Sequence, residues 1–160
     1  MKDLIAGTVA YVKEVLQGAE GGHDWFHTER VWKMARYIRE MEDRGDLAVI
    51  EPAALLHDIA DPKFFEGDLE KGPQMAFDFL DRAGLDSDRV RLVTGIIRNI
   101  SFKGGIIYEP VNSVEFGIVQ DADRLDAMGA IGIARAFHYG GFRNRPIHDP
   151  SVPFREYRDT

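Results

Sequence analysis

Histidine and aspartate are the residues of this sequence best suited to chemistry, because both can bind a metal ion and exchange protons near neutral pH. His27 lies four residues before Val31 and seven before Met34. Helical spacing therefore places its imidazole on an apolar face that points into the core. A single inward histidine is usually a hydrogen-bonded core residue. His27 alone does not indicate a site.

A second histidine, with an acid beside it, changes this interpretation. His57 shares one apolar helical stripe with Ile50, Ala53 and Ala54, and Asp58 follows it directly. An ionised carboxylate buried beside imidazoles is costly unless a cation compensates it, and adjacent His and Asp side chains at a helix end can reach one ion. A hydrogen-bonded His–Asp pair or a helix C-cap explains the dipeptide as well, so this alternative stays open.

An acidic run supplies candidates for a further ligand. Asp121, Asp123 and Asp126 lie in a segment whose apolar residues mark it as a packed helix. Asp123 and Asp126 are i, i+3 neighbours on one face, so one can bind an ion while the other orients a ligand. Spacing does not choose among the three, and a solvated acidic face also explains the run.

Helices must position these side chains, because apolar residues recur with helical spacing along most of the chain. A first amphipathic helix carries Leu4 to Val15. A second starts near Trp25 after Asp24 as N-cap, and its apolar stripe comprises Val31, Met34, Ala35, Ile38 and Met41. A third covers about residues 47–60, is apolar on most of its surface and is therefore expected to be buried.

The remaining pattern predicts helices over about residues 69–83, 87–100, 113–128 and 130–139, with a loop over 101–112. Residues 141–160 are rich in proline and polar residues and are expected to be irregular. The sequence thus predicts an all-α bundle of about six to seven helices, forming one domain over residues 1–160, which is close to the usual size of a domain.

Composition limits the chemistry further. The chain has no cysteine, which excludes disulfides, thiolate zinc sites and a cysteine nucleophile. With 20 Lys and Arg against 27 Asp and Glu, its net charge of −7 opposes broad contact with nucleic acid. A small anion needs only a metal and a few local cations; the candidates are Lys63, Lys71, Arg98 and Lys103. The apolar stretch from Leu4 to Val12 is too short to span a membrane, so we expect a cytoplasmic protein.

The ordered set of candidate residues resembles a known family. His27 followed by Arg30-Val31, the pair His57-Asp58, and Asp123 before Arg-Leu-Asp are similar to the H…HD…D signature of the HD-domain metal-dependent phosphohydrolases. The similarity spans roughly residues 20–140 and is strongest to a bacterial branch with the pattern HDxxH…HDIAD…DADRLD. A bare His-Asp dipeptide occurs three times here, but the ordered set on three helices is specific.

This resemblance implies an HD-domain-like helical bundle around one divalent ion, most often manganese, with cobalt, nickel, magnesium, iron and zinc as alternatives. Carried onto this sequence, the metal ligands are His27, His57, Asp58 and Asp123, and Asp126 orients a ligand. No histidine lies between His57 and His138, which favours a single ion and opposes the two-metal oxygenase branch. Members of the family continue with another helix, so the chain looks incomplete at its C-terminal end.

The expected activity is hydrolysis of a phosphate ester or phosphoanhydride in a nucleotide or similar small metabolite. Two imidazoles and two carboxylates leave positions on a six-coordinate ion for a water and a phosphate oxygen. Asp61 is the candidate general base, although it is equally well explained as a helix-ending residue before Pro62. Lys63 and Lys103 are candidate phosphate contacts, although most lysines are simply solvated.

Two other functions are compatible with the same residues. A non-catalytic nucleotide sensor would keep the fold and the metal, and a purely structural helical protein would bind no metal. Neither nucleic acid nor a membrane is an expected partner, and a homodimer is compatible with the sequence.

Overall fold

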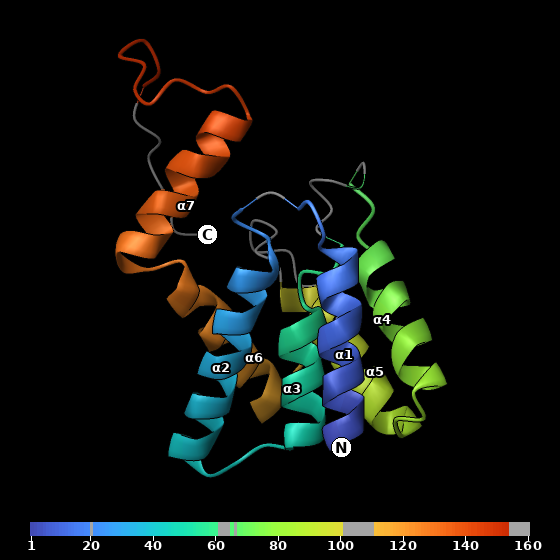
Figure 1. Cartoon of the computed structure of the whole chain (residues 1–160). Coiled ribbons are helices and arrows are strands. Elements are labelled where there is room, and N and C mark those ends of the chain that lie inside the picture. The colour runs from blue at the N-terminus through green and yellow to red at the C-terminus, as the bar shows by residue number, and fades with distance from the viewer. Residues whose placement is uncertain (20, 61–64, 66, 101–110, 154–160) are drawn as a thin grey trace.

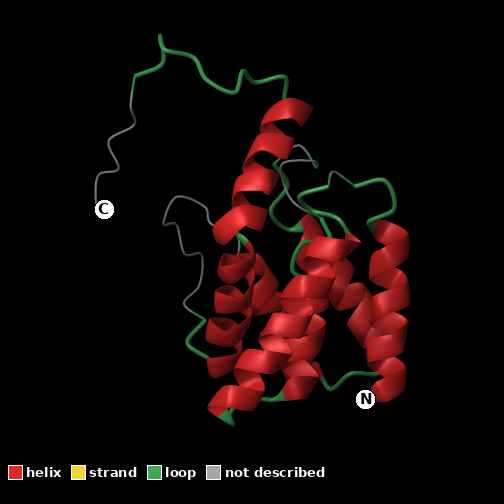
Figure 2. Ribbon diagram, turned by 60° about the vertical axis from the view of Figure 1, so that its left-hand side comes forward, coloured by secondary structure: helices red, strands yellow, loops and turns green. Residues whose placement is uncertain are grey.

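A computed structural model describes residues 1–19, 21–60, 65, 67–100 and 111–153, and these residues form seven helices. Those ranges contain no strand (Figure 2), which confirms the all-α prediction. The helices are α1 (Lys2–Val15), α2 (Trp25–Glu42), α3 (Leu47–Leu56), α4 (Lys71–Arg82), α5 (Ser87–Ile100), α6 (Val114–Asp126) and α7 (Gly129–Phe142).

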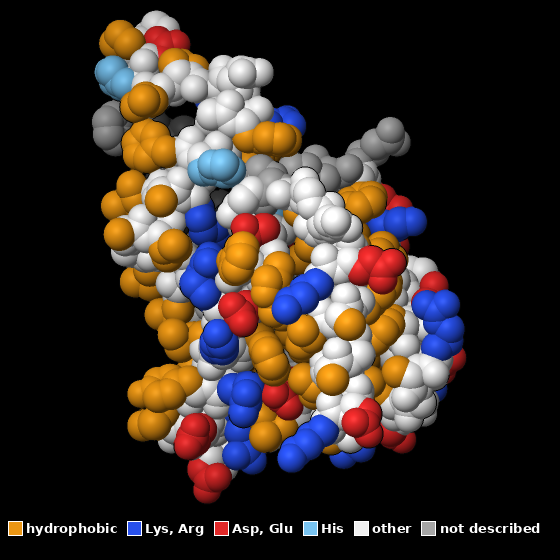
Figure 3. All heavy atoms as spheres, in the orientation of Figure 1, with side chains coloured by type: hydrophobic (Ala, Val, Ile, Leu, Met, Phe, Trp, Pro, Cys, Tyr) orange, Lys and Arg blue, Asp and Glu red, His pale blue; other side chains and the backbone are white. Residues whose placement is uncertain are grey.

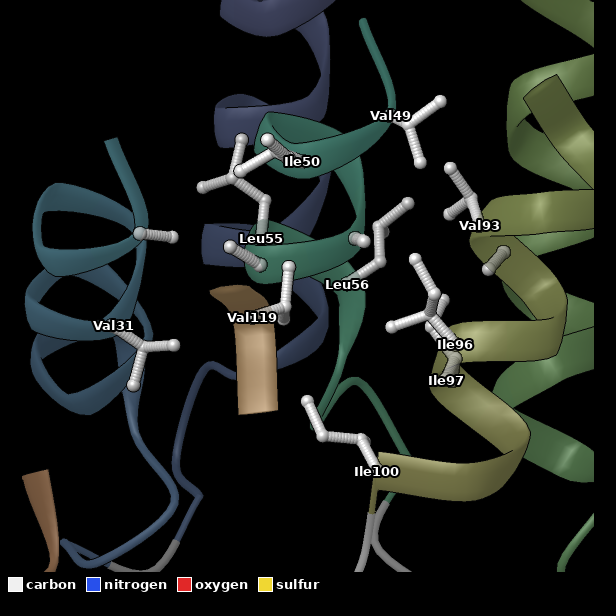
Figure 4. Packing of buried hydrophobic residues seen from close by; sticks show 14 of the residues in the cluster. Val31, Val49, Ile50, Leu55, Leu56, Val93, Ile96, Ile97, Ile100 and Val119 are labelled. Carbon is white, nitrogen blue, oxygen red and sulfur yellow. The ribbon is translucent and has the colours of Figure 1, made fainter. Parts of the chain in front are cut away.

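Helix α3 lies in the middle of the bundle and packs against α1, α2, α5 and α6 (Figure 1). Every residue from Ala48 to Leu56 is buried, as the apolar composition of this segment predicts. Its side chains meet those of the surrounding helices in one continuous core (Figure 4), in which the largest fully buried residues include Ile50, Leu55, Leu56, Leu80 and Ile96.

Polar side chains define where several helices begin. The carboxylate of Asp24 accepts a hydrogen bond from the backbone N–H of His27, so Asp24 is the N-cap of α2, as predicted. Asp46 caps α3 and Ser113 caps α6 in the same way. The turn before α3 needs a glycine at position 45, where φ is 91° and a Cβ would lie 2.9 Å from a methyl group of Ile50.

Two sequence-based expectations about the helices near the site were wrong in detail. Helix α3 ends at Leu56 instead of about residue 60, because the carbonyl of Ala54 accepts a hydrogen bond from the His57 side chain. The inward stripe of α2 is also narrower than predicted. Val31 and Ala35 are fully buried, but Met34 and Met41 are 37% and 68% exposed, because α2 packs mainly against α3 and α6 among the described helices.

Helix α7 projects from the end of the bundle (Figure 1). It extends to Phe142, three residues beyond the predicted end, and none of its residues is buried. Hydrophobic side chains gather over it (Figure 3), among them Ile133 and Phe137, which are 62% and 54% exposed. No helix in the described ranges is long and apolar enough to cross a lipid bilayer.

Candidate metal centre

Three helix ends bring the candidate ligands together. His27 is in the first turn of α2, His57 directly follows the last residue of α3, and Asp123 lies in the last turn of α6. Because α2 packs against both α3 and α6, these three side chains converge although up to 96 residues separate them. Their exposed fractions differ: the side chains of His27, His57 and Asp123 are 1%, 4% and 30% exposed.

The three donor atoms lie close to one another. The Nε2 atoms of His27 and His57 are 3.2 Å apart, and Oδ1 of Asp123 lies 3.5 Å from the first and 3.6 Å from the second. Two ligand atoms that are each about 2.1 Å from one ion are about 3.0 Å apart at right angles and about 3.4 Å apart in a tetrahedron. The donor set of His27, His57 and Asp123 therefore has spacings that fit one divalent cation.

Hydrogen bonds at the far side of each ring fix which imidazole nitrogen faces the cluster. His57 Nδ1 is 2.8 Å from the carbonyl oxygen of Ala54, and His27 Nδ1 is 2.7 Å from Oδ2 of Asp126. Both partners accept, so both Nδ1 atoms carry a hydrogen, and each ring can turn an Nε2 lone pair toward the ion. This is the tautomer that a metal site requires.

The two histidines differ in basicity. Burial lowers the pKa of His27 below its ordinary value, despite the hydrogen bond to Asp126. Burial acts the same way on His57, but the carboxylates of Asp123 and Asp58 outweigh it and raise its pKa to about 9. The Nε2 atom of His57 lies within hydrogen-bonding distance of His27 Nε2, at 3.2 Å.

Asp58 lies beside this cluster, at a longer distance than those that separate the three donor atoms. Its Oδ2 is 3.9 Å from His27 Nε2, still within the span of about 4.2 Å that separates opposite ligands of one ion. The same oxygen is 2.6 Å from Nδ1 of His23, in the loop before α2. Burial alone raises the pKa of Asp58, but the hydrogen bond with His23 and the charge of His57 hold it far below its usual range. Asp58 is therefore ionised.

Asp126 joins three elements behind the centre. It accepts from His27 Nδ1, from Arg30 of α2 at 2.6 and 3.0 Å, and from Arg135 of α7 at 2.9 Å. Burial alone raises its pKa, but these partners hold the pKa far below the usual range. Asp126 contacts the His27 ring at Nδ1, on the side away from the donor cluster, and its role in orienting a ligand stays a prediction.

Arg135 is a contributor that the sequence analysis did not identify. Its second amino group donates to the carbonyl oxygen of Gly22 at 2.6 Å, so one guanidinium connects α7, Asp126 and the loop before α2. The sequence does contain one indication of its importance. Arg135 is the only Asp, Glu, Lys or Arg in the apolar segment 129–142.

The remaining described candidates do not join this centre. Asp61, Lys63 and Lys103 fall outside the described residues. Lys71 begins α4 and is exposed, and Arg98 is paired with Glu70 at 2.8 Å. Asp121 is exposed on α6, and the third His-Asp dipeptide, at residues 148 and 149, is exposed beyond α7.

Comparison with known proteins adds a family and solved relatives. A model of the HD domain matches residues 25–128. The uncharacterised protein YpgQ of Bacillus subtilis (strain 168) is 39% identical over 140 residues, which cover 86% of this chain and 67% of YpgQ.

Crystal structures share the fold. A protein of Lactobacillus plantarum superposes with a TM-score of 0.82 at 32% identity, covering 99% of this chain and 72% of that one. An HD-superfamily hydrolase of Bacillus thuringiensis gives 0.70 at 40% identity, over 95% of this chain and 72% of that one. YpgQ in complex with ADP gives 0.66 at 33% identity, over 92% and 70% of the two chains.

Proposed function

This chain belongs to the HD-domain family, and from that membership we propose that it is a divalent-metal-dependent phosphohydrolase acting on a nucleotide or a similar small phosphorylated metabolite. Its solved neighbours include an HD-superfamily hydrolase and a relative that binds ADP. Hydrolysis is the activity that the family relationship supports, and a nucleotide is the substrate class that the ADP complex supports.

The observation that carries the proposal is the convergence of three metal donors in a buried centre. His27 Nε2, His57 Nε2 and Asp123 Oδ1 lie within 3.2 to 3.6 Å of one another, and the Nδ1 hydrogen bonds hold both rings in the binding tautomer. We assign these three side chains, with Asp58, as the ligands of a single ion, for which manganese is the first candidate.

The ion and the protein side chains would have different roles in the reaction. When bound, a divalent ion supplies positive charge that activates a water and offsets negative charge developing on phosphorus. His27 and His57 present neutral nitrogens and Asp123 and Asp58 present anionic oxygens, so the centre can hold a dication without an unpaired buried charge. From the sequence alone, we assign Asp61 as the general base and Lys63 and Lys103 as phosphate contacts.

A panel of nucleoside mono-, di- and triphosphates tests the proposal. The purified protein is assayed with manganese, magnesium, cobalt or nickel. Orthophosphate, pyrophosphate and the remaining nucleoside or nucleotide are measured separately, because the organic product distinguishes ester from anhydride cleavage. We expect metal-stimulated release from at least one nucleotide and none from His57→Ala. Binding of metal and nucleotide without release would identify a sensor and contradict the proposed activity.

A further inference from the structure

We propose that His23 is a positioning residue that holds the Asp58 carboxylate in place as a metal ligand. This inference rests on the proposed metal centre, and it assigns a role to a histidine that the H…HD…D signature does not include.

The contact between the two side chains is short and largely shielded from water. His23 Nδ1 lies 2.6 Å from Asp58 Oδ2, and the two side chains are 16% and 10% exposed. The bonded oxygen, Oδ2, is also the one that lies 3.9 Å from His27 Nε2. His23 therefore holds the oxygen that faces the donor cluster.

The chemistry of a metal ligand sets the direction of the hydrogen bond. A carboxylate that binds a metal ion is ionised and can only accept, so His23 Nδ1 donates in the role proposed here. A carboxylate with one lone pair engaged by this donor keeps further lone pairs for an ion. Donors behind a metal-binding carboxylate commonly act in this way, fixing its orientation.

The backbone on both sides of His23 is fixed, which allows its ring to hold another side chain. The carbonyl of the preceding residue, Gly22, accepts a 2.6 Å hydrogen bond from Arg135. The following residue, Asp24, caps α2 through the backbone N–H of His27. The ring of His138 also approaches Gly21 so closely that a Cβ there would lie 3.0 Å from its Nε2.

Asp58 has less local support than the two metal-binding histidines. It follows the C-cap of α3, whereas His27 is held by Asp126 and His57 by a carbonyl of its own helix. The hydrogen bond from His23, 35 residues earlier in the chain, supplies the corresponding restraint on Asp58. Without it, the carboxylate would have to be ordered when the ion binds, which weakens binding.

Three substitutions separate the positioning role from general packing. His23→Ala removes the donor. In His23→Asn the amide nitrogen is bonded to Cγ, as Nδ1 is in histidine, so an N–H donor stays near its original position. In His23→Gln the amide lies one methylene farther out and misplaces that donor. His148→Ala is the matched control, because His148 also precedes an aspartate but is exposed.

The readout is the affinity of the metal-free protein for manganese, measured by isothermal titration calorimetry and paired with thermal unfolding in EDTA. We expect Ala and Gln to weaken manganese binding about 10–100-fold, Asn to remain close to wild type, and His148→Ala to match wild type. If His23→Ala does not fold, the comparison of Gln with Asn carries the test.

Each outcome is decisive. Equal manganese affinity in wild type and all three His23 variants would overturn the positioning role while leaving the metal centre intact. Tighter binding in His23→Ala would also overturn it, since His23 would then be drawing Asp58 away from the ion. A wild-type protein that binds no manganese, cobalt or nickel would overturn the proposed function and with it this inference.

Discussion

Replacing Asp126 by asparagine should weaken both the fold and the metal centre. The carboxylate receives four hydrogen bonds, three at Oδ2 from His27, Arg30 and Arg135 and one at Oδ1 from Arg30. An amide with its oxygen at the Oδ2 position can keep the first three bonds, but its NH₂ group then faces the Nε–H of Arg30. The variant therefore loses one charge-assisted bond and the negative charge shared by two guanidinium groups.

The expected loss of stability is about 3 kcal/mol. A hydrogen bond to a charged group contributes about 1.5–3 kcal/mol, and removing the charge weakens the three bonds that remain. Arg30 is 39% exposed, so solvent reduces its share of this loss. For a chain of this size, a loss of about 3 kcal/mol lowers Tm by about 6–12 °C. Because His27 loses its anionic partner, manganese affinity should fall about 10–100-fold.

Differential scanning calorimetry of the metal-free protein gives the first quantity, and calorimetric titration with manganese gives the second. Asp121→Asn is the matched control, since it removes the same charge from the same helix at an exposed position. The reasoning is refuted if the two variants share one Tm and one affinity. If Asp126→Asn cannot be loaded while Asp123→Asn stays loaded, the ligand assignment is wrong by one helical turn.

Further predictions concern the ion itself. Asp123→Asn should lose manganese and turnover together, because an amide replaces an anionic ligand; retained metal by elemental analysis would contradict this. The purified, reloaded protein should hold one ion per chain, and two would refute the single-ion assignment. His57→Ala should abolish turnover with an unchanged far-UV circular dichroism spectrum, because the apolar core holds the bundle; loss of the helical signal would contradict this. Because a metal must displace the proton of His57, whose pKa is about 9, manganese affinity should rise about tenfold per pH unit from pH 7 and level off above pH 9. A flat profile by titration calorimetry would exclude this competition.

Local signals were sufficient to predict most of the fold. Asp24 caps α2 and α5 spans Ser87–Ile100 as expected, because capping side chains and apolar spacing act within one or two turns. The predictions that failed concern features set by the packing of neighbouring helices. Helical spacing places Met34 and Met41 on an apolar stripe, but whether a partner helix covers that stripe depends on how α2 packs.

The site could be predicted only in part for the same reason. The residue types and their inward faces indicate His27 and His57, but spacing alone does not distinguish Asp123 from Asp126. That distinction comes from the rotation of α6, which places Asp123 near the Nε2 atoms of both imidazoles and Asp126 on the Nδ1 side of His27, beside Arg30. The contact of His23 with Asp58 joins residues 35 positions apart and has no local signature.

The unequal exposure of the ligands has a kinetic consequence. His57 is attached to the end of α3, whose residues from Ala48 to Leu56 are all buried. The backbone of α3 should therefore open only with the whole domain, and the amide hydrogens of this helix should exchange among the slowest. Asp123 is the most exposed of the three converging ligands. An ion should therefore leave by detaching from Asp123 first, and substitutions there should change the dissociation rate before they disturb the histidine pair.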